Sequence, residues 1–128
     1  MTLPDDLEDW LTNEGARVVT QMADSDGTPI FEFDRAIYEI WVLDTETRNG
    51  GVSQYFDNRG LSQWQSLAQA AAALHLPSLR EFISAANIVI EGTADPYDAV
   101  LCSDPDLEDI YKRLQTAIVT ELRQFAMT

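Results

Sequence analysis

Few residues in this chain of 128 have the types and spacing that catalysis or metal binding requires. His75 is the only histidine and Cys102 the only cysteine, so neither a zinc site nor a nucleophile–base pair is predicted. Residues 24–27 (Asp-Ser-Asp-Gly) are similar to a calcium loop, but the EF-hand pattern would place Met22 and Phe33 at ligand positions. The sequence therefore predicts no catalytic residue, no metal site and no cofactor, and it favours a protein that is not an enzyme.

Carboxylates are the abundant polar groups, because 22 Asp and Glu stand against 8 Lys and Arg and give a net charge of −14. Such an excess repels phosphates and anionic membranes, so direct binding to nucleic acid or to a membrane is disfavoured and a basic protein partner is favoured. The excess lies in residues 1–47, with twelve acids and two bases, and in residues 91–111, with seven acids and no base. A purely solubilising role for the charge explains the same composition.

The spacing of the acids suggests an acidic surface that could bind a partner. Glu32, Glu39 and Glu46 are seven residues apart, so on one helix they would share a face, with a rise of about 10 Å between neighbours. Phosphates on one DNA strand recur every ~3.4 Å, and carboxylates from several helices could reach a comparable density of charge. An ordinary solvated acidic helix has the same pattern. The predicted partner-binding acidic surface consists of Asp5, Asp9, Glu32, Glu39, Glu46, Asp95, Asp98, Asp104 and Asp106.

The most distinctive stretch is residues 49–58, Asn-Gly-Gly-Val-Ser-Gln-Tyr-Phe-Asp-Asn. Its first residues suit the end of a helix and a close approach of backbone segments, and its aromatic pair is expected in the core. Its amide side chains could bond backbone groups that the loop leaves unpaired, and Asp44 on the preceding helix could accept loop amides. The predicted structural motif consists of Asn49, Gly50, Gly51, Gln54, Tyr55, Phe56 and Asn58.

This motif, together with Glu46 before it, resembles that of a bacterial family of small acidic all-helical proteins whose best-known member is a DNA mimic. The resemblance covers about residues 34–90. It implies an all-helical domain, often dimeric, and in the mimic member an acidic surface that occupies the DNA-binding face of a transcriptional regulator. Two positions depart from the pattern, since Val52 replaces a usual aromatic residue and Asp57 follows the aromatic pair. The motif marks the fold, whereas mimicry depends on carboxylates outside it.

The apolar periodicity of the chain predicts helices throughout. Helices are expected from near Pro4, and over about 31–47, 61–75, 77–90 and 106–127, with a short helical turn near Tyr55. Gly15 could split the first of them. The last helix would be capped by Asp104 or Ser103, with Pro105 in its first position, and a loop would precede it from Glu91 to Asp104. The sequence of residues 28–33 is also compatible with a few residues of β-strand.

These patterns predict one all-α domain over residues 1–128, a compact bundle of about five to six helices with a glycine-rich turn after the second long helix. The family-like core would cover residues 34–90. A lone cysteine excludes an internal disulfide, the acidic N-terminus is unlike a signal peptide, and no apolar run approaches the roughly 18 residues of a membrane span. The sequence therefore favours a cytoplasmic protein.

The predicted function is non-enzymatic binding of a basic protein, such as a DNA-binding regulator or a nuclease, with DNA mimicry as one way to achieve it. Two alternatives remain open at the level of sequence. One is an immunity-type neutraliser of a cationic nuclease or toxin, and the other is a domain with an unknown enzymatic role. A homodimer is compatible with the resemblance.

Overall fold

The structure, a computed structural model, describes residues 3–24, 26–27, 31–91 and 93–127, without the side chain of Asp104. The helices in these ranges are α1 (Asp5–Asp24), α2 (Glu32–Leu74), α3 (Pro77–Ile90) and α4 (Pro96–Ala126). No strand occurs among the described residues, so the predicted all-α fold is confirmed. The strand residues considered near 28–33 fall partly on residues 28–30, which lie outside the description, and from Glu32 onward the chain is helical.

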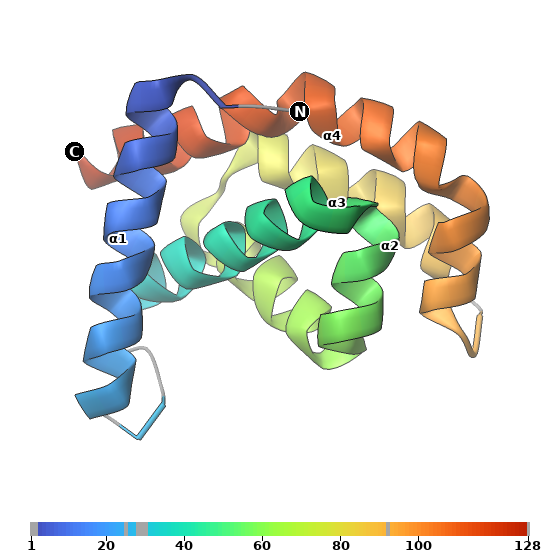
Figure 1. The fold of residues 1–128 in the computed structure, drawn as a ribbon, viewed down its shortest axis with the longest axis horizontal. Helices are drawn as coiled ribbons and strands as arrows, with labels where there is room; N and C mark the ends of the chain where they lie inside the picture. Colours follow the sequence, from blue (N-terminus) through green and yellow to red (C-terminus); the bar gives the residue numbers. More distant parts are fainter. Residues whose placement is uncertain (1–2, 25, 28–30, 92, 128) are drawn as a thin grey trace.

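The helix α2 is interrupted by glycines that divide it into three segments, residues 32–49, 52–59 and 61–74. Helical geometry is lost at Gly50 and Gly51, where the sequence predicts its glycine-rich turn, and again at Gly60. Gly51 (φ 87°, ψ 175°) and Gly60 (φ 77°, ψ −178°) adopt a conformation that is essentially restricted to glycine. These glycines therefore let the three segments of α2 turn back on one another (Figure 1).

The helix α1 and the start of α4 lie at opposite ends of the long axis of the molecule (Figure 1). Figure 1 shows α1 standing at one end of this axis, whereas α4 starts at the opposite end and runs back along the molecule to α1. The first segment of α2 and the helix α3 lie between these ends. Within the described ranges, no helix combines the length and the apolar composition needed to cross a membrane.

The helix α1 is continuous, so the expectation that Gly15 could split it is wrong. Gly15 is buried, and a Cβ atom placed on it would lie 2.8 Å from ring atoms of Trp41. Such a distance is shorter than carbon atoms tolerate. The glycine is therefore needed for the close packing of α1 against the first segment of α2, and the surrounding helical hydrogen bonds carry the helix through it.

The helix α4 begins at Pro96, ten residues earlier than the sequence predicts. Asp95 is its N-cap and accepts a hydrogen bond from the backbone N–H of Asp98 at 3.2 Å. The predicted long loop, and the predicted cap at Asp104 or Ser103, are therefore wrong. Pro105 lies inside the helix, where it removes one backbone donor, and α4 bends in its N-terminal part (Figure 1). The sequence contains two Asp-Pro pairs, at 95–96 and 104–105, and the helix starts at the earlier one.

Aromatic rings connect the motif to the rest of the core. Tyr55 and Phe56 are 0% and 4% exposed, as the sequence predicts for the anchors of the glycine turn. The ring of Tyr55 lies 6.0 Å from that of Trp64, which lies 6.1 Å from Phe82 of α3. Phe82 in turn lies 5.2 Å from Tyr111 of α4. Each edge-to-face pair adds about 0.5–1.5 kcal/mol beyond area burial, so this chain of rings stabilises the packing of α2, α3 and α4.

The amide side chains of the motif do not have the role that the sequence suggests. Asn58 is exposed, and Gln54 lies directly against Gly50. Among the described residues neither side chain hydrogen-bonds to a backbone group. The position of the Gln54 side chain is therefore explained by tight packing against Gly50, and not by hydrogen bonds to backbone amides of the turn.

Candidate functional site

The predicted acidic surface separates into exposed and buried residues. Glu39 and Glu46 are only 2% and 9% exposed. The prediction that Glu32, Glu39 and Glu46 share a solvent-facing side of one helix is therefore wrong, because the later segments of α2 cover that side. The side chain of Asp104 lies outside the described part of the chain. The exposed members of the predicted set are Asp5, Asp9, Glu32, Asp95, Asp98 and Asp106.

The first segment of α2 carries a set of buried carboxylates, here called the buried acids, which are Asp34, Glu39, Asp44 and Glu46. Asp34 lies 2.9 Å from Arg17 of α1, and Glu46 lies 3.7 Å from Arg59 at the end of the second segment. The hydrogen bond to Asp34 raises the pKa of Arg17. Removing an ion from water costs several kcal/mol, so a buried charge needs such partners. The buried acids therefore fix how neighbouring elements pack around the first segment of α2.

Asp44 is the most connected of the buried acids and is fully enclosed. Its Oδ1 accepts hydrogen bonds from the hydroxyl of Tyr111 at 2.6 Å and from Nε2 of Gln115 at 2.7 Å. Its Oδ2 forms an ion pair with Nε of Arg48 at 2.8 Å, and Nη1 of Arg48 donates to Glu8 at 2.6 Å. Burial, followed by the charge of Asp44, raises the pKa of Tyr111 well above 10.0, which keeps its hydroxyl a donor. Side chains of α2 and α4, rather than the loop amides expected from the sequence, thus contact Asp44, and Arg48 links this network to Glu8 of α1.

Glu39 lies at the edge of a pocket of about 360 Å³. Its carboxylate accepts hydrogen bonds from Gln63 and Ser66 of the third segment of α2. Burial raises the pKa of Glu39, while these hydrogen bonds and the charges of Arg35 and Arg59 oppose that rise. Glu39 is therefore part of an enclosed polar cluster and does not belong to the outer surface.

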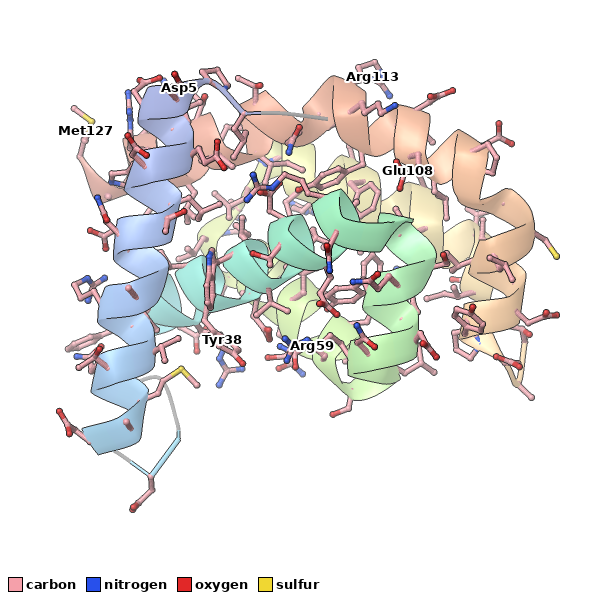
Figure 2. The ribbon with its side chains drawn as sticks, in the orientation of Figure 1. Asp5, Tyr38, Arg59, Glu108, Arg113 and Met127 are labelled. Atoms are coloured by element: carbon pink, nitrogen blue, oxygen red, sulfur yellow. The ribbon has the colours of Figure 1, made fainter. Side chains whose placement is uncertain are left out.

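Five of the six exposed members of the predicted set lie on or next to two elements that are far apart, and the sixth, Glu32, lies at the start of α2. We call Asp5 and Asp9 the α1 acidic surface, and Asp95, Asp98 and Asp106 the α4 acidic surface. Figure 1 places α1 and the start of α4 at opposite ends of the long axis, and Figure 2 labels Asp5 at the top of α1. The exposed members of the predicted set are therefore divided between these two surfaces and Glu32, and they do not form one continuous surface.

These exposed acids are not neutralised by nearby arginines. None of Asp5, Asp9, Asp98 and Asp106 forms an ion pair within the part of the chain that the structure describes. The α4 residues between the two surfaces carry basic groups, but Arg113 pairs with Glu81 at 3.0 Å and Arg123 with Asp6 at 3.4 Å. Both acidic surfaces consequently keep their negative charge available to a partner.

Sequence reasoning missed the polar pocket beside Glu39. Tyr38 and Arg59, both of which line it, are labelled near each other in Figure 2, below the first segment of α2. A weak sequence signal existed, since Arg35 and Glu39 are four residues apart and so are Ser62 and Ser66. Only the reversal of α2 at its glycines brings the two pairs together. The described residues contain no group of three acids, histidines or cysteines that suits a metal ion.

Comparison with known proteins adds one finding to this geometry. A family model described as "DMP19-like protein" matches residues 29–125. The match covers more than half of the chain and extends beyond the range 34–90 on which the sequence resemblance rests. No curated protein and no solved structure matches the chain.

Proposed function

Because this chain belongs to the DMP19-like family, we propose that it is a non-enzymatic acidic protein that binds a basic protein by imitating DNA. DMP19 itself is a DNA-mimic protein. In this proposal the carboxylates of one or both acidic surfaces occupy positions that phosphates would occupy in the nucleic-acid site of a DNA-binding protein.

The observation that carries the proposal is the unpaired state of the exposed acids. The buried acids have internal partners, whereas Asp5, Asp9, Asp98 and Asp106 are exposed and lack an ion pair among the described residues. Complementary charge of this kind steers association with a cationic surface and suppresses binding to acidic partners. These charges, which have no ion-pair partner among the described residues, are thus available for recognition.

Capture and competition test the proposal. The tagged protein is incubated with lysate of its own organism at low salt, retained proteins are eluted with high salt, and the main partner is purified. We expect a basic partner, a complex that weakens steeply with salt, and displacement of the acidic protein by duplex DNA. A neutral or acidic partner, or a complex that salt does not weaken, contradicts the proposal.

Paired variants then locate the binding surface. Asp5→Asn with Asp9→Asn removes charge from the α1 acidic surface, and Asp98→Asn with Asp106→Asn removes it from the α4 acidic surface. Each lost exposed contact is expected to weaken binding a few-fold, since exposed charge pairs contribute about 0.2–1 kcal/mol. Glu39→Gln, which removes a buried charge, is the matched control and is expected to bind like the wild type.

The identity of the partner separates mimicry from neutralisation. A transcriptional regulator that DNA displaces supports the DNA-mimic function. A nuclease or toxin whose activity the protein blocks supports the immunity-type alternative, which the same unpaired charge favours. In that second case the decisive measurement is the inhibition of cleavage by increasing amounts of the acidic protein. It takes the place of the DNA competition.

A further inference from the structure

The pocket beside Glu39 is a feature that DNA mimicry does not use. Its volume of about 360 Å³ lies within the range of about 300–1,000 Å³ that is typical of small-molecule sites. The first and third segments of α2 form most of its walls, with the end of α1 alongside. None of the residues of the α1 or α4 acidic surface lines it.

Within the described residues, two arginines of the pocket have no carboxylate contact shorter than 3.7 Å. The partner of Arg35 is the amide oxygen of Gln69 at 3.4 Å, and Arg59 lies 3.7 Å from Glu46, beyond hydrogen-bonding distance. The arginines with carboxylate contacts between 2.6 and 3.0 Å are Arg17, Arg48 and Arg113. Arg35 and Arg59 thus keep donor capacity that a ligand could use.

The remaining polar groups make the pocket suitable for an anion. Tyr38 and Ser62 bring hydroxyl donors to its lining. Among the described lining residues Glu39 is the one carboxylate, and its oxygens already accept hydrogen bonds from Gln63 and Ser66. Two guanidinium groups thus stand against Glu39, whose oxygens already accept hydrogen bonds, and against Glu46, which lies 3.7 Å from Arg59.

We infer that this pocket binds a small molecule that presents a phosphate or carboxylate group to Arg35 and Arg59. The planar guanidinium fork matches both oxyanions in geometry and forms two parallel hydrogen bonds with each of them. An anion is repelled by the rest of this acidic protein, so binding depends on the specific placement of the two arginines. The simpler role of the arginines, which is to balance Glu39 and Glu46, predicts no saturable binding.

The test is a titration of the full ¹⁵N-labelled chain followed by NMR. Inorganic phosphate and acetate are added in separate experiments, with sodium chloride used to hold the ionic strength constant. We expect at least one of the two anions to cause saturable shifts of the backbone amides of residues 59–66. The relative affinity of phosphate and acetate then assigns the ligand group.

Variants identify the residues that hold the anion. Arg35→Gln and Arg59→Gln are each expected to weaken binding about tenfold or more, the loss typical of a charged hydrogen bond. Arg80→Gln is the matched control, because Arg80 is an exposed arginine of α3 outside the pocket, and it is expected to bind like the wild type. If a glutamine variant fails to fold, Arg35→Lys and Arg59→Lys keep the charge, lose the planar fork, and are expected to weaken binding several-fold.

Two results would overturn the inference. One is the absence of saturable shifts with both phosphate and acetate, and the other is an Arg80→Gln variant that loses as much affinity as the pocket variants. No protein partner takes part in this titration. Its failure would therefore leave the proposed DNA-mimic function untouched, and failure of the partner-capture experiment would leave the anion site untouched.

Discussion

The acids on the first segment of α2 and the acids on α1 and α4 are of the same residue types but have opposite roles in the structure. Asp34 and Asp44, two of the buried acids, each contact a partner on another helix. The exposed acids, represented by Asp9 and Asp98, contact none among the described residues. The net charge of −14 is therefore a poor guide to the binding surface, because part of it belongs to the internal framework of the fold.

The two roles have different energetic requirements. A buried carboxylate loses its hydration and is tolerated only when nearby donors replace the lost water. An exposed carboxylate keeps its hydration and contributes little to folding, so its position can be set by recognition alone. Substitutions in the two groups should consequently have opposite profiles, with loss of stability in one group and loss of partner affinity in the other.

The largest expected difference in stability between a variant of a buried acid and a variant of an exposed acid is at Asp44. Replacement of Asp44 by Asn removes the buried half of its ion pair with Arg48, which keeps Glu8 as a partner, and we expect the free energy of unfolding to fall by about 3 kcal/mol. The exposed control Asp9→Asn is expected to change it by about 0.5 kcal/mol or less. Urea denaturation followed by circular dichroism measures both values. An Asp44→Asn protein as stable as the Asp9→Asn protein would remove the distinction between the two groups.

A smaller loss is expected at the turn that folds α2 over the buried acids. Gly60 has φ of 77°, and a Cβ atom on it would meet nothing within 4 Å, so Gly60→Ala tests backbone strain alone. We expect a loss of about 1–3 kcal/mol in the free energy of unfolding. Ser84→Ala, at an exposed position of α3, is the control in the same urea titration. Equal stability of the two variants would show that α2 reverses without help from this glycine.

The buried acid Glu39 should give stability an unusual dependence on pH. Burial raises its pKa above 4.5, so the folded protein holds this proton more tightly than the unfolded chain does. Its stabilising contribution is therefore present below about pH 4.5 and is lost as the pH rises through the raised pKa. We expect Glu39→Gln to decline less in stability than the wild type over that interval.

The surface variant Glu91→Gln is the control for this pH dependence, since Glu91 is exposed. Unfolding in urea is measured at several pH values from about 4 to 7 for the three proteins, a range set by the ordinary and raised carboxyl pKa. Parallel curves for the wild type and Glu39→Gln would mean that Glu39 is hydrated like a surface acid.

Much of the fold could be predicted because it depends on local patterns. Apolar periodicity places most of the helices, and the glycines at 50, 51 and 60 mark the breaks in α2. The aromatic pair Tyr55 and Phe56 is in the core as predicted. The start of α4 could not be predicted locally, since two Asp-Pro pairs carry the same capping signal.

The burial of Glu39 and Glu46 could not be read from their seven-residue spacing. That spacing correctly places them on one face of a helix, but it does not say whether another segment covers that face. The partners of the buried acids, such as Gln63 and Tyr111, come from elements distant in the sequence. The pocket beside Glu39 escaped prediction for the same reason, because its arginines lie on different segments of α2.

The most direct test of the account is the affinity of the purified partner for a variant in which Asp5, Asp9, Asp98 and Asp106 are all replaced by Asn. Calorimetric titration compares it with the wild type and with Glu39→Gln at two salt concentrations. We predict that the fourfold variant binds much more weakly and with a smaller dependence on salt, while Glu39→Gln binds like the wild type. Wild-type affinity and salt dependence in the fourfold variant would contradict the claim that the exposed carboxylates of α1 and α4 bind the partner.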